Sequence, residues 1–396
     1  MSTFGVAFEA LCAVTEPKKK KREMTEIFPE KTRPILEKMP KPNSPGTVVD
    51  FGELYESIHL LHLNESPFEP SPKAIEAMAK ASHLANRYSD PNASELTTEI
   101  SRRTGVPSDC IVVGSGLEDI IRILAELFVD EGDEVLVPAP SFPLFAVSTR
   151  IERGVPVRIG ITDQGSNDIS LLLDRVTNRT RMAYCCTPNP PNGGVTPYED
   201  VARLAKELPE NVLLVLDEAY HEFAIHAGHP DPLPALRENR KNWVSLRTFS
   251  KAYGLAGLRV GYALCANSEI AEAIRKFRLA YSPTIVSQAA ALAALKDDNH
   301  LASVLNKVVA ERDRLAEQLR TLGLEPYPTS ANFVSVKLEM PGLVVAEKLR
   351  EKGVLVRDWR DPDYPNEIRI SVGTGEDTDA CISALREILL ESEEPQ

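Results

Sequence analysis

The stretch "NVLLVLDEAY", residues 211–220, decides the fold. Its apolar residues follow one another without alternation and then stop at Asp217. A short run of this kind is typical of a strand that is buried on both faces, as the strands of parallel sheets are. The stretch therefore predicts a central strand of a parallel sheet that ends in a carboxylate.

Six further runs share this character. They are "CIVVG" (110–114), "DEVLVPAP" (133–140), "PVRIGI" (156–161), "RMAYCCTPN" (181–189), "WVSLRTFSK" (243–251) and "RVGYALC" (259–265). Amphipathic stretches such as "EDIIRILAELFVD" and "YEDVARLAKEL" lie between several of them and predict helices. Alternating strands and helices predict an α/β fold with a mostly parallel seven-stranded sheet that helices cover on both faces.

The pattern changes after Ser282. One long helical stretch, roughly 285–322, precedes two strand-like runs, "ANFVSVKL" (331–338) and "NEIRISVG" (366–373), and a final helix. This order is typical of a smaller α+β domain. The chain is therefore expected to divide into a disordered basic tail (1–24), an extended N-terminal arm (25–71), a large domain (72–282) and a small C-terminal domain (283–396).

Composition excludes several classes of function. A net charge of −13 argues against a nucleic-acid or anionic-membrane partner. No run approaches the roughly 20 apolar residues of a membrane span, and no secretory signal is evident, so we expect a cytoplasmic protein. The basic run "KKKKR" (18–22) fits either a targeting segment or a solvated tail.

Metal and disulfide chemistry have little support in the sequence. The six cysteines show neither disulfide nor zinc spacing. His221, His226 and His229 match no helical pair of metal ligands, so we expect no metal site.

The residues that end the strands carry the chemistry, because ligands bind at the carboxyl ends of parallel strands. "GSGLED" (114–119) lets backbone amides approach an anion and begins a helix. Asp217, Tyr220, an asparagine of "TPNPPNGG" (187–194) and Lys251 follow other strands. Taken singly, these features fit turns, helix caps and a solvated lysine. Together they fit pyridoxal 5′-phosphate, which needs a Schiff-base lysine, an anion at its ring nitrogen, donors to its phenolic oxygen and a phosphate cup.

At this point the sequence resembles a known family. The motifs are, in order, "LNESP", "NRYSDPNASEL", "GSGLED", "PSFPLF", "TPNPPNGG", "LDEAYHEF", "RTFSKAYGLAGLRVGY", "ANF", "VLVRD" and "IRISVGT". From about Leu63 to Gly375 the chain resembles the fold-type I pyridoxal-phosphate aminotransferases. It is most similar to the histidinol-phosphate aminotransferases and their aromatic aminotransferase relatives.

The resemblance implies roles for residues around the cofactor. Lys251 would form the Schiff base, Asp217 would pair with the ring nitrogen, and Tyr220 would donate to the phenolic oxygen. The remaining cofactor contacts that it implies are the ring-stacking Phe142, the cup residues Ser115, Gly116, Thr248, Ser250 and Arg259, and Tyr88.

Tyr88 would reach the phosphate of a neighbouring subunit, so the resemblance also implies a homodimer with shared active sites. Arg369 would clamp the substrate carboxylate as a bidentate fork. Arg357 could bind a distal phosphate, and Asn64 and Asn332 would lie at the edge of the site. The implied reaction moves an amino group from histidinol phosphate or an aromatic amino acid to a keto acid such as 2-oxoglutarate.

Two departures from the family pattern leave the reaction open. Pro190 stands where the family has an asparagine that contacts the cofactor, so Asn189 or Asn192 must replace it or the contact is missing; we favour Asn189. "PNSPGT" (42–47) lacks the tyrosine and lysine of the usual arm motif. A decarboxylase or cyclase of specialised amino-acid metabolism, with the same fold and cofactor, is therefore the alternative. A non-catalytic regulator would need a DNA-binding domain, and the first roughly 60 residues show no helix-turn-helix pattern.

Overall fold

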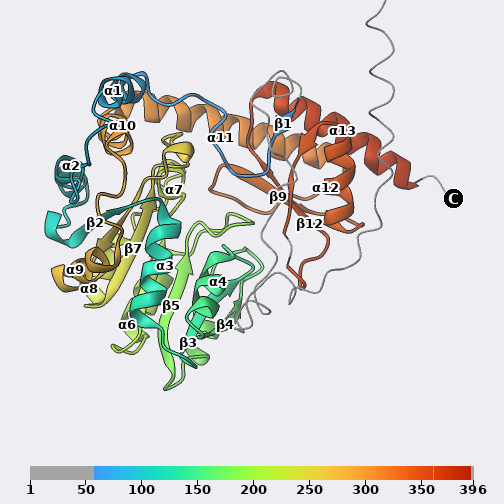
Figure 1. Ribbon diagram of the computed structural model, residues 1–396. Coiled ribbons are helices and arrows are strands. Elements are labelled where there is room, and N and C mark those ends of the chain that lie inside the picture. The colour runs from blue at the N-terminus through green and yellow to red at the C-terminus, as the bar shows by residue number, and fades with distance from the viewer. Residues whose placement is uncertain (1–57, 360, 394–396) are drawn as a thin grey trace, which may run out of the picture. The chain divides into compact units, whose positions relative to one another are not determined.

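The computed structural model describes residues 58–359 and 361–393, all of which belong to one compact unit (Figure 1). The predicted basic tail, most of the predicted arm and the "PNSPGT" motif lie outside the described residues. In the described part of the chain, no helix is both long and apolar enough to span a membrane.

A seven-stranded sheet forms the larger of the sheets, in the order β2-β8-β7-β6-β5-β3-β4. Its strands are β2 (Ile111–Gly114), β3 (Glu134–Ala139), β4 (Val155–Gly160), β5 (Thr180–Cys186), β6 (Leu213–Asp217), β7 (Trp243–Thr248) and β8 (Gly261–Cys265). β8 runs antiparallel to both of its neighbours, and the other pairings are parallel. The prediction of a mostly parallel seven-stranded sheet is confirmed, and each strand lies within or next to its predicted run.

Apolar residues on both faces of this sheet explain its position in the interior. Leu214 and Leu216 of β6 belong to one core cluster, and Leu213 and Val215 belong to another. The first cluster includes residues of α2 (Ser94–Thr104), α5 (Ile169–Asp174), α6 (Tyr198–Glu207), α8 (Leu233–Asn239) and α10 (Ile285–Leu295). The second includes residues of α3 (Leu117–Phe128), α4 (Leu144–Ile151) and α9 (Ser268–Phe277). Helices therefore cover both faces, as predicted.

The C-terminal region holds a three-stranded antiparallel sheet, in the order β11-β12-β9. Its strands are β9 (Phe333–Lys337), β11 (Arg357–Asp358) and β12 (Glu367–Ser371), and α12 (Gly342–Glu351) and α13 (Gly375–Glu393) share a core with it. A separate parallel pair joins β1 (His59–Leu60) to β10 (Val354–Leu355). β1, β10 and β11 were not predicted, because two residues are too few to show a period.

The predicted long helix at 285–322 is two helices, α10 and α11 (Asp298–Thr321). The break lies at Asp297, whose carboxylate accepts hydrogen bonds from Ser71 Oγ at 2.5 Å and from Lys73 Nζ at 3.1 Å. Both donors belong to the start of α1 (Pro72–Ser82), which packs against α10. The contact is tertiary, so local helical periodicity could not reveal it. Figure 1 shows α11 extending toward the three-stranded sheet. The boundary between a large and a small domain near residue 283 remains a prediction.

Candidate active site

The carboxyl ends of β5, β6, β7 and β2 lie at one edge of the large sheet, with β8 between β7 and β2. Asp217, the last residue of β6, is the register partner of Cys186 at the end of β5. Thr248 at the end of β7 and Gly114 at the end of β2 both pair with Gly261. The loops that follow these strands carry most of the predicted cofactor residues.

Lys251 lies just after β7, and its Nζ donates to the Leu63 carbonyl oxygen at 2.9 Å. The side chain is half-buried. Burial, the larger cause, and the positive charge of Arg369, a smaller one, together lower the pKa of this amine to about 8. A lysine with such a pKa is partly unprotonated near neutral pH and can act as a nucleophile and a base.

Tyr220 is buried and accepts a hydrogen bond from Asn64 Nδ2 at 2.8 Å. Burial raises the pKa of its hydroxyl to about 12, so the hydroxyl keeps its proton and can donate it. Ser371 holds Asn64 in turn. The backbone amide of Asn64 donates to Ser371 Oγ at 2.8 Å, and Ser371 Oγ donates to Asn64 Oδ1 at 3.0 Å. Asn332 Nδ2 donates to the Asn64 carbonyl oxygen at 3.0 Å. Both predicted edge residues are therefore part of one network that holds Tyr220.

Asp217 is 3% exposed, and its Oδ1 accepts a hydrogen bond from the Ala219 amide at 3.0 Å. Burial raises its pKa to about 7, although the Ala219 hydrogen bond acts in the opposite direction. A cation placed against this carboxylate would favour its charged form. A protonated ring nitrogen is such a cation, so the site fits the role predicted for Asp217.

The predicted phosphate cup surrounds the start of α3. Gly116 has a φ of 79°, and a Cβ at this position would lie 2.6 Å from Arg259 Nη2. The backbone and the guanidinium therefore approach as closely as only glycine permits. Thr248 Oγ1 and Ser250 Oγ lie 3.1 Å apart beside them. These groups lie at a helix N-terminus, where an anion is favoured, and Arg259 Nη2 also lies 3.8 Å from Glu118 Oε2.

Two amides of the cup already have acceptors. The Ser115 amide donates to Asp119 Oδ2 at 2.9 Å, and the Gly116 amide donates to the Gly114 carbonyl oxygen at 2.8 Å. The Ser115 hydroxyl contacts the hydroxyl of Ser282. Direct binding of phosphate by these two amides therefore remains a prediction.

Arg369 lies on β12, and its Nη2 donates to the His62 carbonyl oxygen at 2.6 Å. Its guanidinium carbon lies 5.5 Å from the centre of the Phe333 ring, which in turn packs edge-on against Tyr220. Burial lowers the pKa of Arg369 to about 10, which leaves it charged. Arg357 on β11 is its register partner, so the two predicted substrate arginines occupy adjacent strands.

Three successive residues, His62, Leu63 and Asn64, contact Arg369, Lys251 and Tyr220 respectively. We call them the 62–64 segment. Sequence reasoning found Asn64 through the "LNESP" motif but missed the other two contacts. Those contacts use backbone carbonyl oxygens, which every residue has, so no residue type could have marked them.

The predicted asparagine near the cofactor has two candidates, and both are fully buried. Asn189 Nδ2 donates to the Pro140 carbonyl oxygen at 2.9 Å, and its Oδ1 accepts from Ser141 Oγ at 2.6 Å. Asn192 has no partner for either amide atom among the described residues and lies against Gly165. Asn189 is thus tied to the loop that carries Phe142.

Phe142 and Tyr88 occupy different environments. Phe142 is half-buried and packs edge-on against Phe145, with ring centres 5.7 Å apart. Tyr88 is 81% exposed and stacks on Tyr281 at 4.4 Å. An exposed aromatic pair of this kind suits a contact with another molecule.

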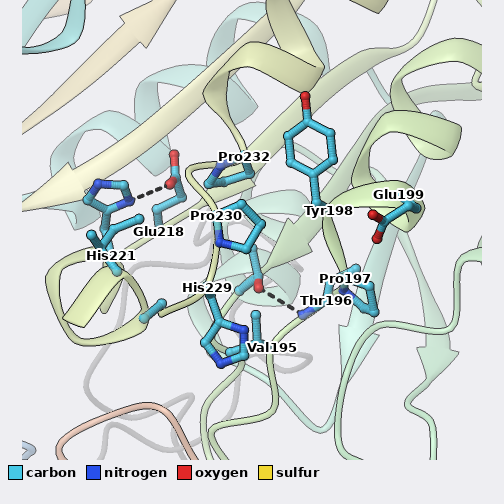
Figure 2. A pocket seen from close by; sticks show the side chains of 13 residues that line it. Val195, Thr196, Pro197, Tyr198, Glu199, Glu218, His221, His229, Pro230 and Pro232 are labelled. Atoms are coloured by element: carbon cyan, nitrogen blue, oxygen red, sulfur yellow. Dashed lines mark hydrogen bonds and ion pairs between the residues drawn. The ribbon is translucent and has the colours of Figure 1, made fainter. Parts of the chain in front are cut away.

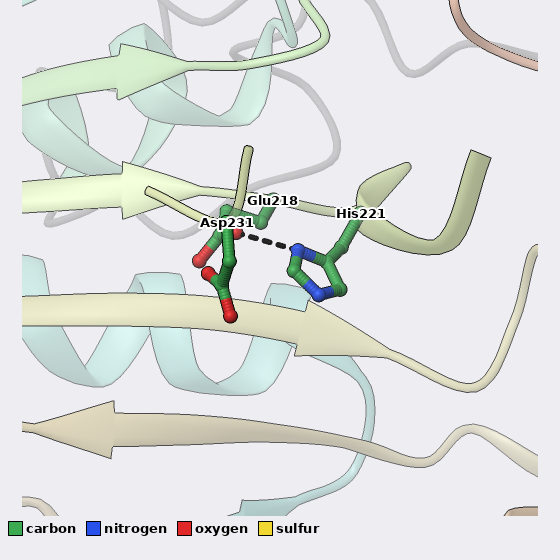
Figure 3. Close-up of side chains that lie close together, drawn as sticks. All are labelled: Glu218, His221 and Asp231. Atoms are coloured by element: carbon green, nitrogen blue, oxygen red, sulfur yellow. Dashed lines mark hydrogen bonds and ion pairs between the residues drawn. The ribbon is translucent and has the colours of Figure 1, made fainter. Parts of the chain in front are cut away.

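Glu218, His221 and Asp231 are the group with metal-ligand spacing among the described residues (Figure 3). The His221 ring contacts Glu218 at 2.8 Å. Arg247 Nη2 lies 3.1 Å from Glu218 and 2.9 Å from Asp231, so a guanidinium already bridges the two carboxylates. The group is therefore explained as an ion-pair network.

A pocket of about 310 Å³ lies beside this network (Figure 2). Glu218 and His221 line it, together with the residues that begin α6. Because side chains alternate along a strand and its continuation, Glu218 faces the opposite side of the sheet from Asp217. The pocket is therefore separate from the lysine site.

The fold and the lysine site together define an enzyme of the aminotransferase type. Residues 57–385 match the family model described as aminotransferase class I and II. The chain belongs to this family.

Similarity to individual proteins agrees with this assignment. The chain is 35% identical to a histidinol-phosphate aminotransferase of Moorella thermoacetica, over 82% of this chain and 84% of that protein. It is 36% identical to an aromatic amino acid aminotransferase of Streptomyces coelicolor, over 92% of this chain and 99% of that protein. It also resembles the crystal structure of histidinol-phosphate aminotransferase from Sinorhizobium meliloti in complex with pyridoxal-5′-phosphate. The TM-score is 0.83 at 29% identity, over 93% of this chain and 100% of that one.

Proposed function

We propose that this aminotransferase moves an amino group from histidinol phosphate or an aromatic amino acid to a keto acid such as 2-oxoglutarate. One observation carries the proposal: the 62–64 segment brings Arg369, Lys251 and Tyr220 to a single place. A cation for a carboxylate, an amine of lowered pKa and a buried hydroxyl are the groups that amino transfer needs side by side. The names of the relatives support the two substrate classes.

Pyridoxal 5′-phosphate is the cofactor that these residues suit. When bound, it supplies a carbonyl for an amine and an electron sink for the α-carbon. Lys251 would hold its carbonyl carbon, Asp217 its ring nitrogen and Tyr220 its phenolic oxygen. The contacts proposed for its phosphate and ring are those of Ser115, Gly116, Thr248, Ser250 and Arg259 at the phosphate, and of Phe142 and Asn189 at the ring.

Lys251 would also move the proton. Displaced by the incoming amine, its Nζ would take the proton from the substrate α-carbon and return it at the adjacent cofactor carbon. A pKa of about 8 places the amine near the ideal for this task at neutral pH. Tyr220 would hold the phenolic oxygen through a hydroxyl that keeps its proton over the same pH range.

Arg369 and Arg357 would bind the anionic groups of the substrate. Their side-by-side register on β12 and β11 offers two guanidinium groups to one ligand. Arg369 would take the carboxylate of an amino or keto acid, and Arg357 a phosphate or second carboxylate. Asn64 and Asn332 would define the edge of the site.

We further propose a homodimer with shared active sites in the cytoplasm. Leu84, Tyr88, Leu279 and Tyr281 are exposed, at 51%, 81%, 75% and 46%. Ser89 Oγ donates to the Tyr281 carbonyl oxygen at 2.7 Å, and the next residue, Ser282, contacts Ser115. The apolar patch therefore borders the phosphate cup, where Tyr88 of one subunit would reach the cup of the other.

A single half-reaction tests the chemistry. Cofactor-loaded protein is mixed with histidinol phosphate, phenylalanine or glutamate without a keto acid, and pyridoxamine phosphate is quantified. Stoichiometric conversion by histidinol phosphate or phenylalanine is expected, whereas Lys251→Ala should give none. Lys251→Arg, which keeps the charge, should also be inactive. Release of carbon dioxide or a cyclised product with the aldehyde recovered would instead support the decarboxylase or cyclase alternative.

A further inference from the structure

His62 is a buried histidine that borders the substrate arginines. The residue is 7% exposed, and its Nδ1 has no hydrogen-bond partner among the described residues. Its carbonyl oxygen accepts the hydrogen bond from Arg369. Buried polar atoms are usually paired, so an unpaired imidazole nitrogen at this position calls for an explanation.

Positive charges face His62 from three elements. Arg357 belongs to β11, Arg369 to β12 and Arg350 to α12, and all three act on the imidazole. Burial is the larger cause and these charges are the smaller one, and together they lower the pKa of the His62 imidazole to about 4. The ring is therefore neutral in the free enzyme at physiological pH.

Three carboxylates on β11, β12 and α13 are in the sequence neighbourhood of these arginines or on the elements around them. Asp377 of α13 contacts His59 Nδ1 of β1 at 2.7 Å. Glu367 of β12 accepts from Tyr327 at 3.4 Å. Asp358 follows Arg357 on β11 and so faces the other side of that strand. None of these carboxylates is among the charges that act on His62 in the described part of the chain.

We propose that His62 is a proton-linked member of the substrate-anion site: neutral in the free enzyme, it takes up a proton when a dianionic substrate binds at Arg357 and Arg369. This inference rests on the proposed function, which puts the anionic groups of the substrate at these arginines. A bound dianion offsets their charges and favours the protonated imidazole. Protonated His62 then favours the dianion in return, because linkage is reciprocal. His62 acts through charge rather than by contact with reacting atoms.

The expected effect is measurable. A charge close to an ionisable group in a protein of intermediate dielectric shifts the pKa of that group by roughly one to two units. At pH 5.5 the enzyme should therefore take up about half a proton as a dianion binds, and its affinity for the dianion should rise about twofold between pH 7.5 and 5.5. A monoanion should produce a much smaller effect. His62 would thus favour doubly charged substrates.

Calorimetry of the holoenzyme tests the proposal. Sulfate, which stays dianionic over this pH range, is titrated at pH 5.5 in two buffers with different ionisation enthalpies, and methanesulfonate is the monoanionic counterpart. The visible absorption of the cofactor, recorded in parallel, separates protonation at the cofactor from protonation of the protein. His62→Gln should bind sulfate without the proton uptake. His229→Gln, which removes an imidazole bonded to Ser330 instead, should keep it.

The outcomes are distinct. Sulfate binding without proton uptake, or with the same uptake in His62→Gln, overturns the role of His62 and leaves the proposed function intact. Failure of sulfate to compete with the amino donor overturns the arginine site as well. If the variants do not fold, ¹³C-histidine spectra of the wild-type chain decide: one of its seven histidines must gain a proton on addition of sulfate.

Discussion

The ionisation of Asp217 shows how one side chain can link cofactor binding to stability. Its pKa in the folded chain is about 7, whereas its ordinary value is 3.8. At a pH between these two pKa values, the Asp217 carboxyl loses its proton in the unfolded chain and keeps it in the folded chain. The contribution of this group to the stability of the apoenzyme therefore falls as pH rises from about 4 to about 7. A cationic ring nitrogen beside Asp217 would remove the free-energy cost of burying the ionised carboxylate.

Asp217→Asn should consequently stabilise the apoenzyme at neutral pH and have little effect at pH 4. The difference in unfolding free energy should grow to at most about 4 kcal/mol by pH 7, as measured by urea denaturation. Asp174→Asn, which changes an exposed carboxylate, should show no such trend. A pH-independent difference for Asp217→Asn would contradict the raised pKa.

Asn189 and Asn192 form a matched pair of equally buried amides on one loop. Loss of a donor to the phenolic oxygen leaves more negative charge there and favours the protonated lysine–cofactor linkage. Asn189→Ala should therefore raise the pH midpoint of the cofactor's visible absorption by about one unit. Asn192→Ala should leave it unchanged. The opposite pattern would assign the contact to Asn192.

At the scale of elements, the start of α3 depends on a residue without a side chain. Gly116 combines a positive φ with the close approach of Arg259, so an added methyl group strains the backbone and displaces the guanidinium together. This is a requirement of the junction between β2 and α3, because neither element alone brings Arg259 to that position.

Gly116→Ala should weaken cofactor binding by roughly ten- to a hundredfold, measured by titration of the apoenzyme. Gly132→Ala is the matched control, because Gly132 also has a positive φ, 86°, but no atom lies within 4 Å of the added Cβ. Equal losses in both variants would mean that backbone strain, and not the phosphate cup, is responsible.

For the whole molecule, the exposed patch of Leu84, Tyr88, Leu279 and Tyr281 is the surface on which the proposed dimer depends. Leu279→Asp would bury an unpaired carboxylate in that interface, which is costly. We expect the dimer to dissociate in sedimentation velocity and cofactor affinity to fall with it. Leu390→Asp, at a 59% exposed position on α13, should leave both unchanged. An unaltered dimer in Leu279→Asp would place the interface elsewhere.

Much of the large sheet could be predicted because its strands are buried on both faces. Continuous apolar runs such as residues 212–216 carry that signal locally. Lys251, Asp217 and Tyr220 could be predicted for a related reason: the carboxyl ends of parallel strands share one edge, so strand order alone brings them near one another. Arg369 and Arg357 were found through motifs rather than through periodicity.

The sequence by itself determined the α/β sheet, the chemical types of residue at its edge and the resemblance to a family. Only the tertiary structure decided the break at Asp297, the short strands β1, β10 and β11, and the contacts of the 62–64 segment. Most of these depend on residues far apart in the chain, such as Leu63 and Lys251, which are separated by 188 positions. Their hydrogen bonds use backbone atoms or unspecialised polar groups, so only the folded chain shows which of them meet.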